Sequence, residues 1–200
     1  MVQDGEIGDI VMVRDCIFEH FGFLNSPSWY LNPQLAGAGT VLSSGVHLVD
    51  RVLWFLGEFP NAVSGYMQKR FLNACVEDAA QMSLGFPSGR SAQISFGLPA
   101  EPQLLVCDLE LIGTRGSLIV NTWRGFELRR NGTSTYHAGY TSETHQEKVL
   151  RGLMGEVEEF CAAIQEDRDP RPSVEESTRA FRVVMAFYRT ASSTTPGSKS

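Results

Sequence analysis

The stretch AGAGTVLSSGVHLVDRVLWFLG at positions 36–57 predicts a helix with two different faces. One face is apolar and repeats at the three- and four-residue spacing of an α-helix, in Leu42, Val46, Val49, Leu53 and Leu56. The adjacent stripe carries polar or amphipathic side chains, in Ser43, His47, Asp50 and Trp54. Gly57 is suited to end such a helix. We therefore expect residues 40–56 to bury one face and to present an imidazole and a carboxylate along its edge.

His47 allows two interpretations from this stretch alone. Its imidazole could form part of the floor of a site, or it could be a partly buried side chain bonded to the backbone. Gly37 and Gly39 let backbone segments approach closely before the helix. They resemble the start of a dinucleotide-binding motif, but the sixth position is Leu42 and no strand precedes them. We therefore predict no cofactor-binding residues in this chain.

The composition excludes several classes of function. The 200 residues are 42% hydrophobic and 20% charged, with a net charge of −6, which suits one domain with a sizeable core. Cationic residues do not cluster, so we expect no nucleic-acid partner. Apolar runs are too short to span a bilayer, and the acidic first twenty residues do not form a signal peptide. We therefore expect a cytoplasmic protein without membrane contact.

Cysteine and histidine spacing gives no sign of a metal centre. The four cysteines lack paired spacing and are predicted to be reduced thiols in the core, as Cys16, Cys75, Cys107 and Cys161. The four histidines are likewise scattered, and we predict no metal site.

A series of short apolar or alternating segments predicts strands, at 7–18, 61–71, 76–86, 91–97, 104–113, 117–121 and 125–132. The turn residues at 87–90 indicate that the third and fourth of these form a hairpin. Strand follows strand without space for crossover helices, so we expect a mainly antiparallel sheet.

Two helices are predicted near the C-terminus. The first covers 149–164, and the second begins at a capping box formed by Ser173 and Glu176. The predicted fold is α+β, a large mainly antiparallel open sheet with three helices packed on one face. We expect residues 1–192 to form one domain and 193–200 to be a disordered tail. Apolar residues of both parities in the later strands suggest that a second subunit covers the other face.

Five further positions are candidate site residues with competing structural interpretations. Arg14 and Asp15 form either a substrate-facing pair or an ion pair on the wet face of the first strand. Trp29 lies in an irregular segment ahead of the first helix, where it could contact a ligand or cover a sheet edge. Glu77 and Asp78 could perform acid–base chemistry, but a solvated strand end is favoured.

Several motifs follow one another in a recognisable order. They are GEIGDIVMVRD, SPSWYLNP, AGAGTVLSSGVHLVDRVLWFLG, VEDAAQMSLGFPSGRSAQISF, LIGTRGSLIV and the closing pair around PRPSVEEST. Over roughly residues 5–192 this order resembles the C-terminal domain of the Gfo/Idh/MocA oxidoreductases, the relatives of glucose–fructose oxidoreductase and inositol dehydrogenase. The resemblance implies a dihydrodipicolinate-reductase-like fold, homo-oligomer contacts through the open sheet face, and NAD or NADP bound by a separate N-terminal Rossmann domain.

The resemblance also implies roles for individual residues. His47 matches the catalytic histidine, whose imidazole can take the proton of a sugar or polyol hydroxyl as hydride leaves carbon. Ser43 stands where many members have Asp, and Trp29 and Asn32 match a loop that reaches toward substrate. Asp50 matches an HxxD aspartate, which we interpret as more structural than catalytic.

The nucleotide-binding half has no counterpart in this sequence, so we expect the chain alone to bind no NAD(P) and to transfer no hydride. The predicted function is the substrate-binding and oligomerisation domain of an NAD(P)-dependent oxidoreductase acting on a sugar or polyol. The alternative is a non-catalytic, sheet-mediated dimerisation or ligand-binding module.

Overall fold

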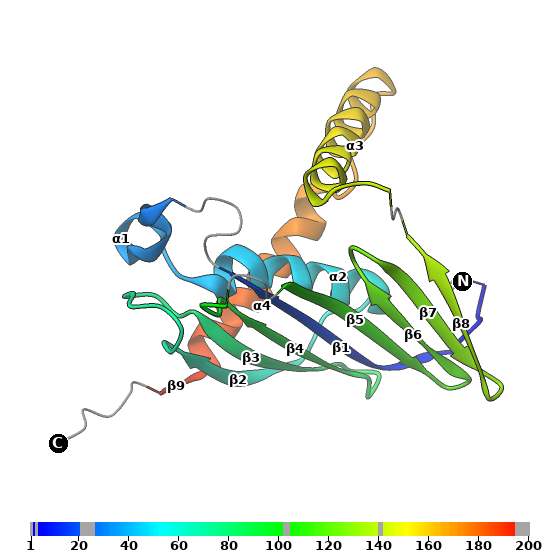
Figure 1. Ribbon diagram of the computed structural model, residues 1–200, viewed down its shortest axis with the longest axis horizontal. Coiled ribbons are helices and arrows are strands. Elements are labelled where there is room, and N and C mark those ends of the chain that lie inside the picture. Colours follow the sequence, from blue (N-terminus) through cyan, green and yellow to red (C-terminus); the bar gives the residue numbers. More distant parts are fainter. Residues whose placement is uncertain (1, 3, 21–26, 102–104, 140–141, 195–200) are drawn as a thin grey trace.

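A computed structural model describes residues 2, 4–20, 27–101, 105–139 and 142–194, and its centre is one open sheet (Figure 1). The strands run in the order β8-β7-β6-β5-β1-β4-β3-β2-β9. Their bounds are β1 Ile10–Glu19, β2 Ala62–Gln68, β3 Ala79–Gly85, β4 Ser91–Gly97, β5 Leu105–Gly113, β6 Gly116–Asn121, β7 Gly125–Arg130, β8 Thr133–Ala138 and β9 Ser192–Thr194. Only the β1–β4 and β2–β9 pairs of this sheet are parallel, which confirms the predicted mainly antiparallel arrangement.

The β3–β4 hairpin shows how the sequence pattern fixes one face of the sheet. Ala80 pairs with Phe96, and Met82 pairs with Ile94, and all four side chains are buried. Intervening residues such as Gln81 are exposed. Gly89 adopts a φ of +84° in the connecting turn, which a glycine accommodates without strain.

Two of the long helices cover the buried face. Helix α2 (Val46–Leu56) follows a π-helical turn, η2, at Val41–Gly45, and α4 spans Val174–Thr190. Both contribute fully buried side chains to one core, among them Val49, Val52, Val183 and Phe187. The capping box predicted for α4 is present, because Ser173 Oγ accepts the Glu176 amide hydrogen and Glu176 bonds the Ser173 amide. These two helices and the sheet form a two-layer α+β domain.

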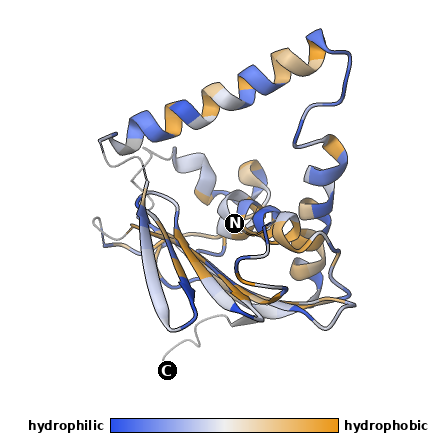
Figure 2. Cartoon of the chain, turned by 90° about the vertical axis from the view of Figure 1, so that its right-hand side faces the viewer, coloured by the Kyte–Doolittle hydropathy of each residue, from blue (hydrophilic) through white to orange (hydrophobic). Residues whose placement is uncertain are grey.

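The third long helix departs from the prediction. Helix α3 (His145–Gln165) begins at its own capping box, but it stands away from the sheet instead of packing on it (Figure 1). Orange apolar bands recur along its length in Figure 2. The expectation of three helices packed on one face is therefore wrong for α3, because amphipathic spacing predicts a helix but not the surface it contacts.

The two edges of the sheet were also not foreseen. No strand was predicted after 125–132, yet residues 133–138 form β8, in which His137 stacks on Phe126 with ring centroids 4.6 Å apart. At the other edge, Ser193 and Thr194 belong to β9, and the remainder of the expected tail, 195–200, lies outside the described residues.

The open face of the sheet is more polar than the sequence suggested. Arg14, Gln81, Gln93, Ser95 and Glu110 line a shallow hollow of about 520 Å³ there. The alternation of side chains along the strands also places some exposed large apolar or aromatic residues on this face, among them Met12, Tyr66 and Tyr136.

A short arm precedes the first long helix. It consists of a 3-10 turn, η1 (Ser28–Leu31), and one turn of helix, α1 (Pro33–Ala36). In Figure 1 this arm lies on the helix-bearing side of the sheet. Among the described residues, no helix is both long and apolar enough to cross a bilayer.

Candidate functional site

The exposed edge of α2 and its preceding turn carry the predicted site residues Ser43 and His47. Both side chains are exposed. Ser43 Oγ donates to the Gly39 carbonyl oxygen at 3.3 Å, and the π-helical turn widens the spiral between residues 41 and 45. Such turns recur at functional sites in other proteins. The π-helical turn therefore interrupts the regular 3.6-residue spacing that the sequence predicted around Ser43. His47, in the α-helix that follows, is still exposed to solvent.

The start of this helix is held by a buried carboxylate. Glu77 Oε1 accepts the amide hydrogens of Gly39 at 2.9 Å and Val41 at 3.2 Å, and the Tyr188 hydroxyl at 2.5 Å. Burial is the main cause that raises the pKa of Tyr188 well above its ordinary value, and the Glu77 charge adds to it. A side chain at Gly39 would place its Cβ 1.9 Å from the Glu77 carbonyl oxygen, so only glycine fits there.

The neighbouring Asp78 organises a second segment. Its carboxylate accepts the amide hydrogens of Arg70, Phe71 and Leu72 at distances of 2.7–3.1 Å, and the residue is fully buried. The expectation that Glu77 and Asp78 form a solvated strand end is therefore wrong. Their partners are backbone amides of non-strand segments and, for Glu77, the distant Tyr188 hydroxyl, which a local sequence pattern does not reveal.

A buried ion pair fixes the middle of α2 to the sheet. Arg51 Nε donates to Asp15 Oδ2 at 2.9 Å, a second guanidinium nitrogen contacts Oδ1, and Nη1 reaches Thr122 Oγ1 at 3.1 Å. Burial raises the pKa of the Asp15 carboxyl, against the opposing effect of Arg51. Asp15 is thus on the helix side of β1, and its partner is Arg51 instead of its neighbour Arg14.

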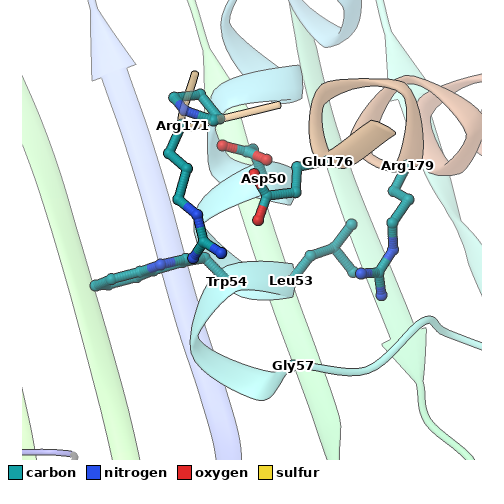
Figure 3. Close-up of a pocket in the computed structure, with 8 residues that line it drawn as sticks. Asp50, Leu53, Trp54, Gly57, Arg171, Glu176 and Arg179 are labelled. Carbon is teal, nitrogen blue, oxygen red and sulfur yellow. The ribbon is translucent and has the colours of Figure 1, made fainter. Parts of the chain in front are cut away.

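A hollow of about 390 Å³ lies between α2 and the first turn of α4 (Figure 3). Its lining combines two acids, two arginines and an indole, from Asp50, Leu53, Trp54, Gly57, Arg171, Pro172, Glu176 and Arg179. Figure 3 shows the Asp50 and Glu176 carboxyl groups near each other and the Arg171 side chain reaching toward Trp54. The Trp54 side chain is 71% exposed, which leaves a flat apolar surface at the rim.

Electrostatics connects this hollow to His47. Burial raises the pKa of Asp50, the Glu176 charge raises it further, and His47 acts in the opposite direction. The carboxyl group of Asp50 therefore lies within the electrostatic range of both Glu176 and the imidazole. Sequence reasoning identified Asp50 but missed Arg171, Glu176 and Arg179. The capping box at Ser173 was the available signal, because it marked the start of a helix without showing which helix it would face.

The arm presents the predicted residues Trp29 and Asn32. Trp29 is 45% exposed and stacks on Tyr30, with ring centroids 4.2 Å apart and planes 23° apart. Asn32 caps α1, because its Oδ1 accepts the Gln34 amide hydrogen at 3.0 Å. Both side chains are exposed at the surface, but the side-chain oxygen of Asn32 is already used to cap α1.

Arg14 is separated from the other candidates. It lies on the open face of β1 and pairs with Glu110 of β5 at 3.1 Å, whereas α2 lies across the opposite face. The structure therefore groups His47, Ser43 and Asp50 on one helical segment, places Trp29 and Asn32 on the arm, and puts Arg14 on the far side of the sheet.

A second hollow, of about 560 Å³, lies at the start of the helical segment. It is mainly apolar, with Leu42, Met67, Phe181 and Met185 among its lining residues, which also include Lys69. The thiols do not all lie in the core as predicted, because Cys75 and Cys161 are exposed. Within the described ranges, no group of three or more His, Cys, Asp or Glu side chains is arranged to hold a metal ion.

An oxidoreductase family matches this chain in sequence and in fold. Residues 1–119 match the model of the GFO/IDH/MocA C-terminal domain. The chain therefore belongs to the GFO/IDH/MocA family, as its sequence motifs suggested. No curated protein sequence matches it significantly.

Solved structures share the fold at low sequence identity. An aldose–aldose oxidoreductase from Caulobacter crescentus complexed with glycerol has a TM-score of 0.73 and 20% identity, and the match covers 94% of this chain and 55% of that one. An oxidoreductase from Agrobacterium radiobacter in complex with NAD+, L-tartaric acid and magnesium has a TM-score of 0.82 and 13% identity, with 94% and 56% covered. Levoglucosan dehydrogenase in complex with NADH and levoglucosan has a TM-score of 0.76 and 20% identity, with 94% and 58% covered. The chain thus spans a little over half the length of these structures.

Proposed function

We propose that this chain is the substrate-binding and oligomerisation domain of an NAD(P)-dependent oxidoreductase acting on a sugar or polyol hydroxyl. The observation that carries the proposal is the exposed imidazole of His47 on α2, within electrostatic range of Asp50 at the rim of a hollow. Family membership and neighbours named as an aldose–aldose oxidoreductase and a levoglucosan dehydrogenase support the choice of substrate class.

His47 is assigned the proton transfer. Oxidation of an alcohol removes a hydride from carbon and a proton from oxygen, and an imidazole can accept that proton near neutral pH. Ser43, one helical turn earlier, can hydrogen-bond a neighbouring hydroxyl but cannot hold a negative charge at neutral pH. Asp50 accepts hydroxyl hydrogens when ionised, and the exposed Trp54 indole offers an apolar face to a sugar ring.

The nicotinamide cofactor does not fit the glycine-rich turn of this chain. The Gly39 and Val41 amides, which a pyrophosphate would need, already donate to Glu77, and the Glu77 carboxylate would repel the phosphates. We therefore assign NAD(P) binding to a separate domain, and assign to this chain the positioning of substrate and the handling of its proton.

The test joins a nucleotide-binding domain, taken from levoglucosan dehydrogenase, upstream of the full chain. Turnover of a panel of aldoses and polyols is followed by NADH absorbance. His47→Ala should lower kcat at least a hundredfold, since general acid–base catalysis contributes about 10² to 10⁴. His137→Ala, a histidine on the distant edge strand β8, is the matched control and should leave turnover unchanged. Equal activity of the His47→Ala and parent fusions would refute the assignment.

A second candidate, a non-catalytic module assembled through the open sheet face, is favoured by the exposed Tyr66 and Tyr136 on that face. Calorimetry with the same sugars and sedimentation of the chain alone separate the two. Sugar binding that is weakened by His47→Ala supports the substrate domain. Assembly without any sugar binding, lost on replacing Tyr66 by Glu, supports the module.

A further inference from the structure

The hollow between α2 and the first turn of α4 has the polar side chains of a carbohydrate site (Figure 3). Its two acids, Asp50 and Glu176, are balanced by two guanidinium groups, those of Arg171 and Arg179. Because these charges cancel, the lining favours a neutral polar ligand over an anion or a cation. Carboxylates and guanidinium groups are planar and can each bond two neighbouring hydroxyl groups at once. The charged part of the lining therefore suits a ligand with many hydroxyl groups.

The Trp54 indole supplies the apolar part of such a site. Its side chain is 71% exposed, the largest exposed fraction of any Phe, Tyr or Trp among the described residues. Phe55 packs against the indole with ring centroids 4.6 Å apart and ring planes 68° apart, which helps to fix its orientation. A sugar ring has a face made up mainly of C–H groups, and an exposed indole is a flat apolar surface on which that face can pack. The hollow therefore offers both kinds of contact that a sugar ring needs.

The position of the hollow separates it from the imidazole by more than the width of one sugar ring. Its volume of about 390 Å³ falls within the range of about 300–1,000 Å³ that is usual for small-molecule sites. His47 and Trp54 are both exposed and lie two turns apart on α2, or about 10 Å along the helix axis. Asp50, between them, lines the hollow and is within electrostatic range of His47, so the two positions share one edge of the helix.

We propose that this hollow is a second sugar subsite and that the substrate is a disaccharide or another glycoside with two rings. One ring presents its hydroxyl group to His47. The next ring packs on Trp54, and its hydroxyl groups bond the four charged side chains of the hollow. This inference rests on the proposed function, because it places the reacting ring at His47. The subsite contributes binding and takes no part in the proton transfer, since Trp54 lies two helical turns from the imidazole.

Calorimetry on the full chain tests the subsite directly. Cellobiose, maltose and lactose are compared with glucose and galactose. We expect at least one disaccharide to bind at least tenfold more tightly than either monosaccharide. Trp54→Ala should reduce this ratio to below three, and Trp54→Phe should retain most of it, because a phenyl ring still offers a flat apolar face. Phe160→Ala removes an aromatic side chain that is 56% exposed on α3, and this matched control should leave the ratio unchanged.

Steady-state kinetics on the fusion with the nucleotide-binding domain distinguish this subsite from the catalytic assignment. Trp54→Ala should act mainly by raising the KM for the disaccharide, at least tenfold, because it removes binding that ground state and transition state share. His47→Ala should instead lower kcat. A change in kcat for Trp54→Ala as large as that for His47→Ala would contradict a role confined to binding.

Two calorimetric results would overturn the subsite. The first is a set of disaccharides that bind no more tightly than the monosaccharides, absence of binding included. The second is a preference for disaccharides that survives Trp54→Ala. The proposed function can fail separately, because a Trp54-dependent preference together with turnover that is insensitive to His47→Ala would refute the catalytic assignment and leave the subsite intact.

Discussion

Replacing Arg51 by methionine removes the cation from a carboxylate that has no access to solvent. The Asp15 side chain is 0% exposed, and Arg51 supplies its bidentate partner. Breaking a buried pair from one side costs about 3–5 kcal/mol. This loss of stability has an upper limit, because the folded variant can protonate Asp15 instead of burying its charge. At pH 7, protonation costs about 1.4 kcal/mol for each pH unit above an unfolded pKa of about 3.9, or about 4 kcal/mol in total. We therefore expect Arg51→Met to lose about 4 kcal/mol at pH 7 and to melt about 10 °C lower.

The deficit should depend on pH in one direction. Without Arg51, the pKa of Asp15 in the folded state lies further above its value in the unfolded state. The free energy of unfolding of the variant is therefore highest at low pH, where Asp15 is protonated in both states, and falls as the pH rises. At pH 4.5 the protonation ceiling falls below about 1 kcal/mol, and mainly the loss of the Thr122 hydrogen bond remains. Urea unfolding followed by circular dichroism measures both values. The double variant Asp15→Leu, Arg51→Met is the control and should match or exceed the parent. A deficit that is below 1 kcal/mol at pH 7, or constant with pH, would refute the reasoning.

Two further predictions concern the hollow and the helix beside it. Ser173→Ala removes the N-cap of α4 and should lower the free energy of unfolding by about 1 kcal/mol in urea titrations, whereas an unchanged midpoint would show that the cap is dispensable. The pKa of Asp50 is raised in the folded state, so the ionised carboxylate opposes folding. The contribution of protonated Asp50 to stability is present at low pH and is lost as the pH rises through the folded pKa. Asp50→Asn should therefore unfold at higher urea than the parent at pH 7 and at the same urea at pH 3, and a lower midpoint at pH 7 would contradict this.

Local patterns were sufficient for much of the fold. The alternation of Ala80, Met82 and Leu84 with exposed residues predicted β3, and the Ser173–Glu176 box predicted the start of α4, because both signals lie within one element. Strand β8 was missed because it lies at an edge of the sheet and five of its six residues are exposed, so it lacks the apolar alternation of an inner strand.

The site was harder to predict because its contacts are long-range. Glu77 and Tyr188 are separated by 111 positions in the sequence, and Asp15 and Arg51 by 36. Contacts at such separations produce no periodic pattern that the sequence alone would reveal. His47 and Asp50 could be proposed since they share a helix, whereas the facing residues Arg171 and Glu176 depend on how α4 packs on α2. The uncovered face of α3 was equally hidden, because spacing reveals that a face is apolar without revealing what it contacts.

The Glu77 carboxylate has a consequence for motion. It joins the turn before α2 to Tyr188 near the end of α4. The two helices are thereby linked into one rigid frame, and His47 belongs to it. Conformational adjustment at this end of the domain therefore falls to the arm at 27–38, whose hydrogen bonds are short-range and whose aromatic pair, Trp29 and Tyr30, can move without disturbing that frame. We expect any movement of the arm to occur by a hinge near Gly37, while α2 stays in place.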